Sequence, residues 1–118
     1  MILKYAHIYA GKDGNSHFED VEVPLKEEEG DQYKSILMKA TGIIFRVTGT
    51  GYDLDWHPVS RKQFVITLEG EGDVVASDGT IRRFGPGDIM LADDMGSKGH
   101  LSKAVGGKPR KSIFVTLD

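Results

Sequence analysis

The 118-residue sequence contains no cysteine. It therefore cannot form a disulfide, a thiolate metal site or a cysteine nucleophile, and it suits a reducing compartment. No stretch approaches the ~20 apolar residues of a membrane-spanning helix, and the first residues lack the apolar core of a signal peptide. The net charge is -3, so no overall positive field exists to attract nucleic acid or anionic lipid. We expect a cytoplasmic protein that binds neither nucleic acid nor membrane.

Alanine is scarce, with 6 residues, whereas glycine accounts for 15. This imbalance disfavours long helices and favours frequent turns. Short runs rich in β-branched and aromatic residues recur between Gly or Asp clusters, which is typical of an all-β sandwich or barrel. A chain of this length buries enough surface for one hydrophobic core, so we expect a single domain over residues 1–118.

The spacing of these runs predicts ten strands. They cover residues 3–9, 18–23, 36–39, 43–48, 63–69, 73–77, 80–84, 88–92, 100–105 and 112–117. Asp78-Gly79 is expected to form a two-residue hairpin turn, because both residue types tolerate positive φ angles. The charged run 26–30 is interpreted as a solvated connection, with a partner site as the alternative.

The stretch from Gly51 to Gly70 carries the most distinctive spacing. Gly51, His57 and Gly70 match the first motif of the cupin superfamily, G-x5-H-x-H-x3-E-x6-G, and Val59 and Gln63 stand at its second His and its Glu. The chain therefore resembles a small single-domain cupin with a degenerate first motif.

A second stretch strengthens this resemblance. Residues 83–91, Arg-Phe-Gly-Pro-Gly-Asp-Ile-Met-Leu, resemble the turn and strand that open the second cupin motif, and His100 follows near the place of that motif's histidine. The resemblance covers about residues 43–117. It implies an all-β, cupin-type jelly-roll barrel or sandwich with a site inside the barrel mouth.

The resemblance also implies a metal site at His57, Gln63 and His100, holding a divalent transition metal such as Fe, Mn, Ni or Zn. Alternate side chains of a small barrel point inward, so these groups can converge from different strands. Val59 cannot coordinate a metal and the Gln63 amide is a neutral ligand, so the affinity should be lower than with the full set. The alternative is that His57 merely ends a strand and His100 lies exposed in a loop, without a metal.

Three further residues suit a polar or carboxylated ligand. Arg61 offers a planar fork for a carboxylate, and Trp56 offers a flat face for a ring or a sugar. Asp94 is a candidate for ligand contact, as a general base or as a group that orients a histidine. Their alternatives are a surface salt bridge for Arg61, core packing for Trp56 and a turn for Asp94.

The sequence leaves three functions open and does not decide whether the protein is an enzyme. The first is a cupin that binds a small polar or carboxylated molecule and uses a metal for an isomerase, lyase or oxygenase reaction. The second is a metal-free small-molecule binding or sensing module. The third, carbohydrate binding through Trp56, rests on fold analogy. Resemblance to small cupins also implies a homodimer in which the opening strand, residues 3–9, pairs with a neighbouring subunit.

Overall fold

The computed structural model describes all residues 1–118, and every regular element in it is a strand. This confirms the all-β class. No helix is present that is long and apolar enough to cross a membrane. The strands in chain order are β1 (Ile2–Ala10), β2 (Ser16–Pro24), β3 (Lys26–Glu28), β4 (Gln32–Lys34), β5 (Gly42–Thr48), β6 (Asp53–His57), β7 (Gln63–Glu69), β8 (Glu71–Ala76), β9 (Ile81–Phe84), β10 (Ile89–Asp93), β11 (His100–Val105) and β12 (Arg110–Thr116).

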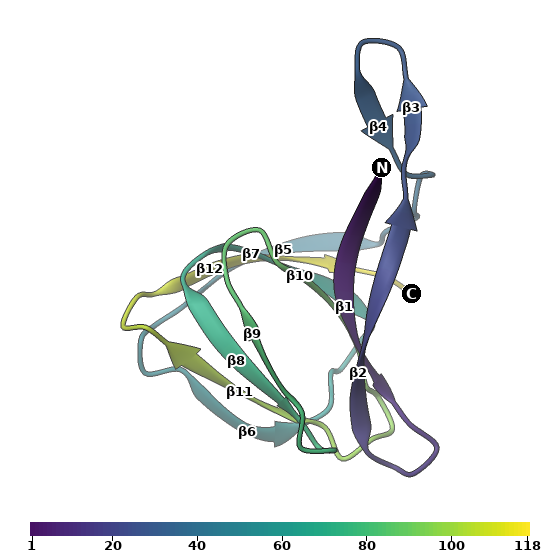
Figure 1. The fold of residues 1–118 in the computed structure, drawn as a ribbon. Coiled ribbons are helices and arrows are strands. Elements are labelled where there is room, and N and C mark those ends of the chain that lie inside the picture. The colour runs from purple at the N-terminus through teal and green to yellow at the C-terminus, as the bar shows by residue number, and fades with distance from the viewer.

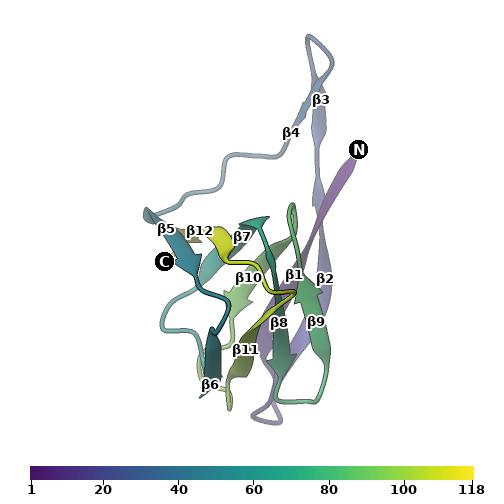
Figure 2. The ribbon, with the colours of Figure 1, turned by 90° about the vertical axis from the view of Figure 1, so that its left-hand side faces the viewer.

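Two sheets face each other and form the body of the molecule (Figure 1). The larger sheet has six strands in the order β2-β1-β10-β7-β12-β5, and the smaller has four in the order β6-β11-β8-β9. Neighbouring strands are antiparallel, except that β1 runs parallel to β10. The chain passes repeatedly from one sheet to the other, which gives a jelly-roll sandwich. β3 and β4 pair only with each other and project from the body as an arm (Figure 2).

The hydrophobic core lies at one side of the sandwich. Its nine buried residues come mainly from β1 and β10 of the larger sheet and from β8 and β9 of the smaller: Ala6, Ile8, Val59, Val65, Val74, Ala76, Phe84, Met90 and Ala92. Side chains alternate across a strand, so every second residue of each strand points between the sheets. The opposite side, between β5 and β12 above and β6 and β11 below, is lined largely by polar side chains and is not filled by the core.

Most predicted strands have a counterpart, and β7 and β11 have the predicted bounds. The predicted strand at 36–39 is wrong. These residues form part of a linker between the arm and β5, and the Leu37 side chain is 97% exposed. The apolar residues 36–38 wrongly indicated a strand, because this segment has no neighbouring strand to pair with. β6 was missed because its alternating acidic residues lie on an exposed strand.

The charged run 26–30 is exposed to solvent, as expected, but it has regular structure. It forms β3 and the turn into β4, in which Gly30 and Asp31 both have positive φ. The turn at Asp78-Gly79 also differs from the prediction, because only Gly79 has a positive φ and four residues separate β8 from β9. The hairpin is present, but its connection is longer than two residues.

The opening strand is only partly paired on its second side. β1 pairs with β2 along its whole length, but it pairs with β10 only over Ala6–Tyr9. Residues 3–5 therefore have a neighbouring strand on one side alone. The pairing of this strand with a neighbouring subunit, and the homodimer itself, stay predictions.

Candidate functional site

A cavity of about 190 Å³ lies between the two sheets, beside the core. Its walls come from β5, β6, β7, β8, β10, β11 and β12, so residues far apart in sequence meet there. The volume is below that of drug-sized ligand sites, which hold roughly 300–1,000 Å³. The cavity therefore suits a small molecule.

His57 and His100 lie opposite each other on β6 and β11, and both line this cavity. Their ring centroids are 4.7 Å apart. The Nδ1–H of His57 donates to the backbone oxygen of Asp55 at 2.7 Å, and that of His100 donates to the Asp94 carboxylate at 2.6 Å. These bonds fix each ring's orientation and leave Nε2 of both rings without a partner in the protein. The two histidines are thus brought together as the sequence predicted.

Asp94 is completely buried and lies behind His100 rather than in the cavity wall. One carboxylate oxygen accepts from the Val59 N–H at 2.9 Å, and the other accepts from His100. Asp94 therefore orients His100, which is one of the roles expected for it. It also belongs to a turn, because the Ser97 N–H and hydroxyl donate to its backbone oxygen. Direct ligand contact by Asp94 stays a prediction, although its carboxylate reaches the cavity only through His100.

Gly99 allows β11 to approach β6 at this point. Its φ is +87°, and a Cβ atom there would overlap the backbone of His57. Only glycine combines a left-handed conformation with this close approach. The segment before His100 thus places His100 in a buried position, so the alternative of an exposed loop histidine is wrong.

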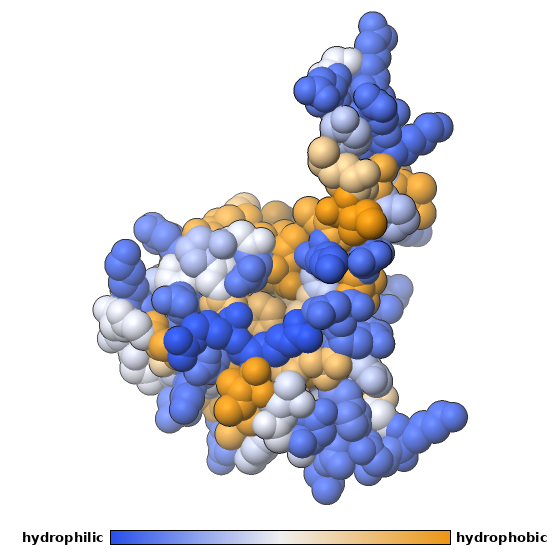
Figure 3. Space-filling model, viewed as in Figure 1, coloured by the Kyte–Doolittle hydropathy of each residue, from blue (hydrophilic) through white to orange (hydrophobic).

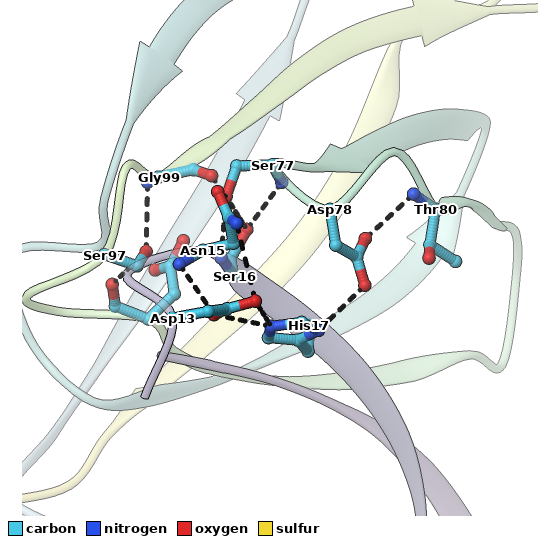
Figure 4. Close-up of polar contacts among 10 residues, drawn as sticks. Asp13, Asn15, Ser16, His17, Ser77, Asp78, Thr80, Ser97 and Gly99 are labelled. Carbon is cyan, nitrogen blue, oxygen red and sulfur yellow. Dashed lines mark hydrogen bonds and ion pairs between the residues drawn. The ribbon is translucent and has the colours of Figure 1, made fainter. Parts of the chain in front are cut away.

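A polar cluster at the β1–β2 turn holds Gly99 from the other side (Figure 4). The buried Ser16 hydroxyl donates to the Gly99 backbone oxygen at 2.8 Å, and Ser16 also exchanges hydrogen bonds with Ser77. His17 lies between Asp13 and Asp78 and bonds to both carboxylates. The cluster joins the β1–β2 turn, the β8–β9 turn and the β10–β11 connection, so it supports the wall that carries His100.

The charges of this cluster shift its pKa values. The pKa of Asp13 is lowered to about 2, mainly by its hydrogen bond with His17. The pKa of His17 is raised, mainly by the same hydrogen bond and further by the charges of Asp13 and Asp78. The ion pairs of His17 with Asp13 and Asp78 connect the β1–β2 turn to the β8–β9 turn.

The predicted metal ligands His57, Gln63 and His100 all line the cavity, as does Val59. The structure nevertheless contains no group of three or more His, Cys, Asp or Glu side chains that could hold a metal ion. Protein metal sites usually provide three or four such ligands. Two imidazoles and one neutral amide fall short of this, so the donor set does not fit a firmly held divalent ion.

Two arginines that the sequence interpretation did not select dominate the charge of the cavity. Arg46 on β5 and Arg110 on β12 both line it. The guanidinium carbon of Arg46 lies 5.0 Å from the centre of the Tyr52 ring and 5.1 Å from that of Phe114, in cation–π geometry. One Arg110 amino group donates to the Thr67 hydroxyl at 2.6 Å. Both guanidinium groups are thus held in place by neighbouring side chains.

No Asp or Glu lines the cavity, so neither arginine has a counter-charge there. Burial lowers the pKa of Arg110, and the positive charge of Arg46 lowers it further. The Nε–H of Arg110 is buried and has no hydrogen-bond partner. A buried donor without an acceptor is costly, and it is rare in folded proteins. The arrangement is therefore one that a bound anion would complete.

The residues around these arginines contain little local indication of their role. Arg46 lies within the apolar strand Gly42–Thr48, between Phe45 and Val47. A single charge between apolar neighbours was the only local indication that this residue has a special role. Arg110 belongs to the short basic stretch 108–111, where it begins β12 and lines the cavity. Trp56 and Arg61 are both exposed and are not among the residues that line the cavity. Their roles in ligand binding stay predictions.

The two facing sheets and the polar cavity between them define a cupin-type fold. Among solved structures, the cupin domain of Cnp3 from Schizosaccharomyces pombe is similar with a TM-score of 0.54 and 10% sequence identity, over 100% of this chain and 83% of that chain. A conserved protein of unknown function from Streptococcus pyogenes, SPY1581, is similar with a TM-score of 0.50 and 17% identity, over 71% of each chain. No protein-family model matches the sequence, and no curated protein matches it. The likeness shows the fold.

Proposed function

We propose that this protein binds a small carboxylated molecule in the cavity between its sheets and needs no resident metal to do so. One observation carries the proposal: Arg46 and Arg110 face the cavity, and no acidic side chain does. The chain as a whole has a net charge of -3, so this local positive charge opposes the overall balance. A guanidinium group binds a carboxylate with two parallel, charge-assisted hydrogen bonds.

The rest of the cavity supports a ligand with two different ends. Val65, Met90 and Phe114 supply apolar wall to the same cavity. The unpartnered Nε2 atoms of His57 and His100 can accept hydrogen bonds from a hydroxyl or amino group. A small hydroxy or amino acid has this combination of carboxylate, short carbon chain and donor.

The other functions have less support. An isomerase, lyase or oxygenase reaction of the expected kind requires an ion, and the donor set of the cavity does not fit one. Carbohydrate binding through Trp56 would occur outside the cavity, because the Trp56 side chain is 48% exposed and does not line it. The cytoplasmic location inferred from the absence of cysteine remains a prediction.

Titration of the ¹⁵N-labelled protein with lactate tests the proposal. Arginine Nε–H signals report directly on Arg46 and Arg110, and the Arg110 signal should shift most because this group lacks an acceptor. The exposed Arg61 provides an internal control whose signal should stay unchanged. The lactate concentration should be raised to about 100 mM, which is about 100 times a dissociation constant of 1 mM. If the Nε–H signals of Arg46 and Arg110 do not shift over this range, the proposal is contradicted.

A further inference from the structure

The two arginines of the cavity are neighbours across the pair of strands that carries them. β5 and β12 are antiparallel, with Arg46 opposite Ser112 and Thr48 opposite Arg110. Alternate residues of a strand share a face, so the two arginines lie diagonally across this pair, on the face that lines the cavity. Diagonal neighbours are roughly 7–8 Å apart, and like charges at that distance repel each other. The cavity therefore gathers two positive charges in a small volume.

Two other arginines of the chain are each neutralised by a carboxylate. Arg82 pairs with Asp20 at 2.6 Å, and Arg83 pairs with Asp73 at 2.9 Å. Both arginines belong to β9, and Figure 3 shows a band of hydrophilic side chains across the body over β8 and β9. The cavity differs from this surface, because no acidic side chain lines it.

Asp94 does not supply the missing negative charge. Its buried carboxylate lies behind His100, where one oxygen accepts from the His100 Nδ1–H and the other from the Val59 N–H. Its ion-pair partner is His100 and not an arginine. A charge that is shielded from water is costly unless it is paired. The two positive charges of the cavity are therefore left for a ligand to balance.

The two guanidinium groups are held at different places in the cavity. That of Arg46 lies 5.1 Å from the ring centre of Phe114, which is further along β12 than Ser112. An amino group of Arg110 instead donates to the hydroxyl of Thr67, which is the β7 partner of Ser112. The two groups therefore offer two separate anchoring points. A ligand that satisfies both of them has two anionic groups joined by a short chain.

We propose that the ligand of this cavity is a short dicarboxylic acid, with one carboxylate on Arg46 and the other on Arg110. The inference rests on the proposed carboxylate site and adds a second acidic group to its ligand. Each guanidinium binds one carboxylate with charge-assisted hydrogen bonds, and the Nε–H of Arg110 gains the acceptor that it lacks. A dicarboxylate balances both charges, whereas a monocarboxylate leaves one of them unpaired. The cavity volume of about 190 Å³ restricts the chain between the two carboxylates to a few carbon atoms.

The two histidines define what that chain carries. The Nε2 atoms of His57 and His100 have no partner in the protein, so they accept from a hydroxyl or amino group of the ligand. L-malate is a 2-hydroxy dicarboxylic acid of this kind. L-lactate is the same 2-hydroxy acid with a hydrogen in place of the second carboxylate. The two acids therefore form a matched pair of probes.

Calorimetric titration of the native protein with L-malate, L-lactate and inorganic phosphate tests the proposal. Malate should bind at least about 10-fold more tightly than lactate, because it adds a second charge-assisted pair. Phosphate carries its charge on one centre and should bind less tightly than malate. Equal binding of malate and lactate would overturn the dicarboxylate and leave the carboxylate site in place, whereas binding of neither acid would overturn both. Phosphate that binds more tightly than malate would show that the arginines share a single anion, which also overturns the dicarboxylate.

Three glutamine variants locate the second carboxylate. Arg46→Gln and Arg110→Gln should each bind malate and lactate with affinities within about 3-fold, because one guanidinium remains for either acid. Arg83→Gln is the matched control, since Arg83 lies on β9 outside the cavity, and it should keep the full preference for malate. A preference that survives in both Arg46→Gln and Arg110→Gln would overturn the proposal. The comparison of acids in the native protein needs no variant, so the test stays decisive if a variant does not fold.

Discussion

The buried side chains of Asp94 and His100 share a 2.6 Å hydrogen bond. This bond occupies Nδ1 of His100 and leaves Nε2 available to a ligand in the cavity. Asp94→Asn removes an acceptor, because an amide presents one oxygen to two donors, the His100 Nδ1–H and the Val59 N–H. We expect the free energy of unfolding to fall by about 1–3 kcal/mol. Urea denaturation followed by Trp56 fluorescence measures this change.

Asp93 is the matched control for Asp94. Its carboxylate bonds to His7 at 2.9 Å but is partly exposed, so Asp93→Asn should cost less than about 1 kcal/mol. Equal losses in the two variants would mean that the buried bond is not an important support of the site.

Substitutions at Gly99 and Gly96 distinguish two costs of adding a side chain, namely a clash with a nearby backbone and a positive φ. Both have φ near +87°, but a Cβ at Gly96 meets no atom within 4 Å, whereas one at Gly99 overlaps the His57 backbone. Gly96→Ala should therefore lower the free energy of unfolding by about 1 kcal/mol and Gly99→Ala by at least about 3 kcal/mol. Denaturant unfolding of both variants measures the difference. Comparable losses would show that β11 can move away from β6 at little cost.

The ion pairs of His17 with Asp13 and Asp78 should make the free energy of unfolding depend on pH, both in acid and in weakly alkaline solution. The pKa of His17 is raised above 6.5, so its contribution is fully present below that pH and is lost as the pH rises through the higher folded value. The pKa of Asp13 is lowered from 3.8 to about 2, so its contribution is present above 3.8 and is lost as the pH falls towards 2.

Comparison of the native protein with His17→Gln isolates this contribution. The difference in thermal midpoint should be largest between about pH 4 and 6.5 and should shrink at pH 9 and at pH 2. A difference that does not change with pH would show that His17 stabilises the turn by packing alone.

The donor set of the cavity makes a prediction about metals. Protein purified without added ions should contain far less than one transition-metal ion per chain by elemental analysis, and His57→Ala should not change the content. One equivalent of metal that disappears in His57→Ala but persists in His7→Ala would restore the metal-dependent hypothesis. His7 is the suitable control because it lies outside the cavity, bonded to Glu19 and Asp93.

Local pattern and motif predicted much of this fold and part of its site. The Gly51 to Gly70 motif predicted that His57 and Gln63 face the interior, and the structure places both in the cavity wall with His100. Runs of β-branched and aromatic residues predicted β7 and β11 with their observed bounds. These features depend on short-range alternation, which a sequence displays directly.

The features that were missed depend on pairing between distant strands. Arg46 and Arg110 share the cavity because β12 pairs with β5 and the register sets both side chains on its inner face. A local sequence motif cannot predict this register, because β5 and β12 are far apart in the sequence. The arm was missed for a different reason, since residues 26–34 are polar and their strands have no buried face to impose alternation.

The most direct test of the proposed carboxylate site is calorimetric titration of lactate into three proteins: native, Arg110→Gln and Arg61→Gln. The native protein and Arg61→Gln should bind with the same dissociation constant, and Arg110→Gln should bind at least about 10-fold more weakly. Equal binding by Arg110→Gln, or no binding by the native protein at millimolar lactate, would contradict the claim that the cavity arginines receive a carboxylate.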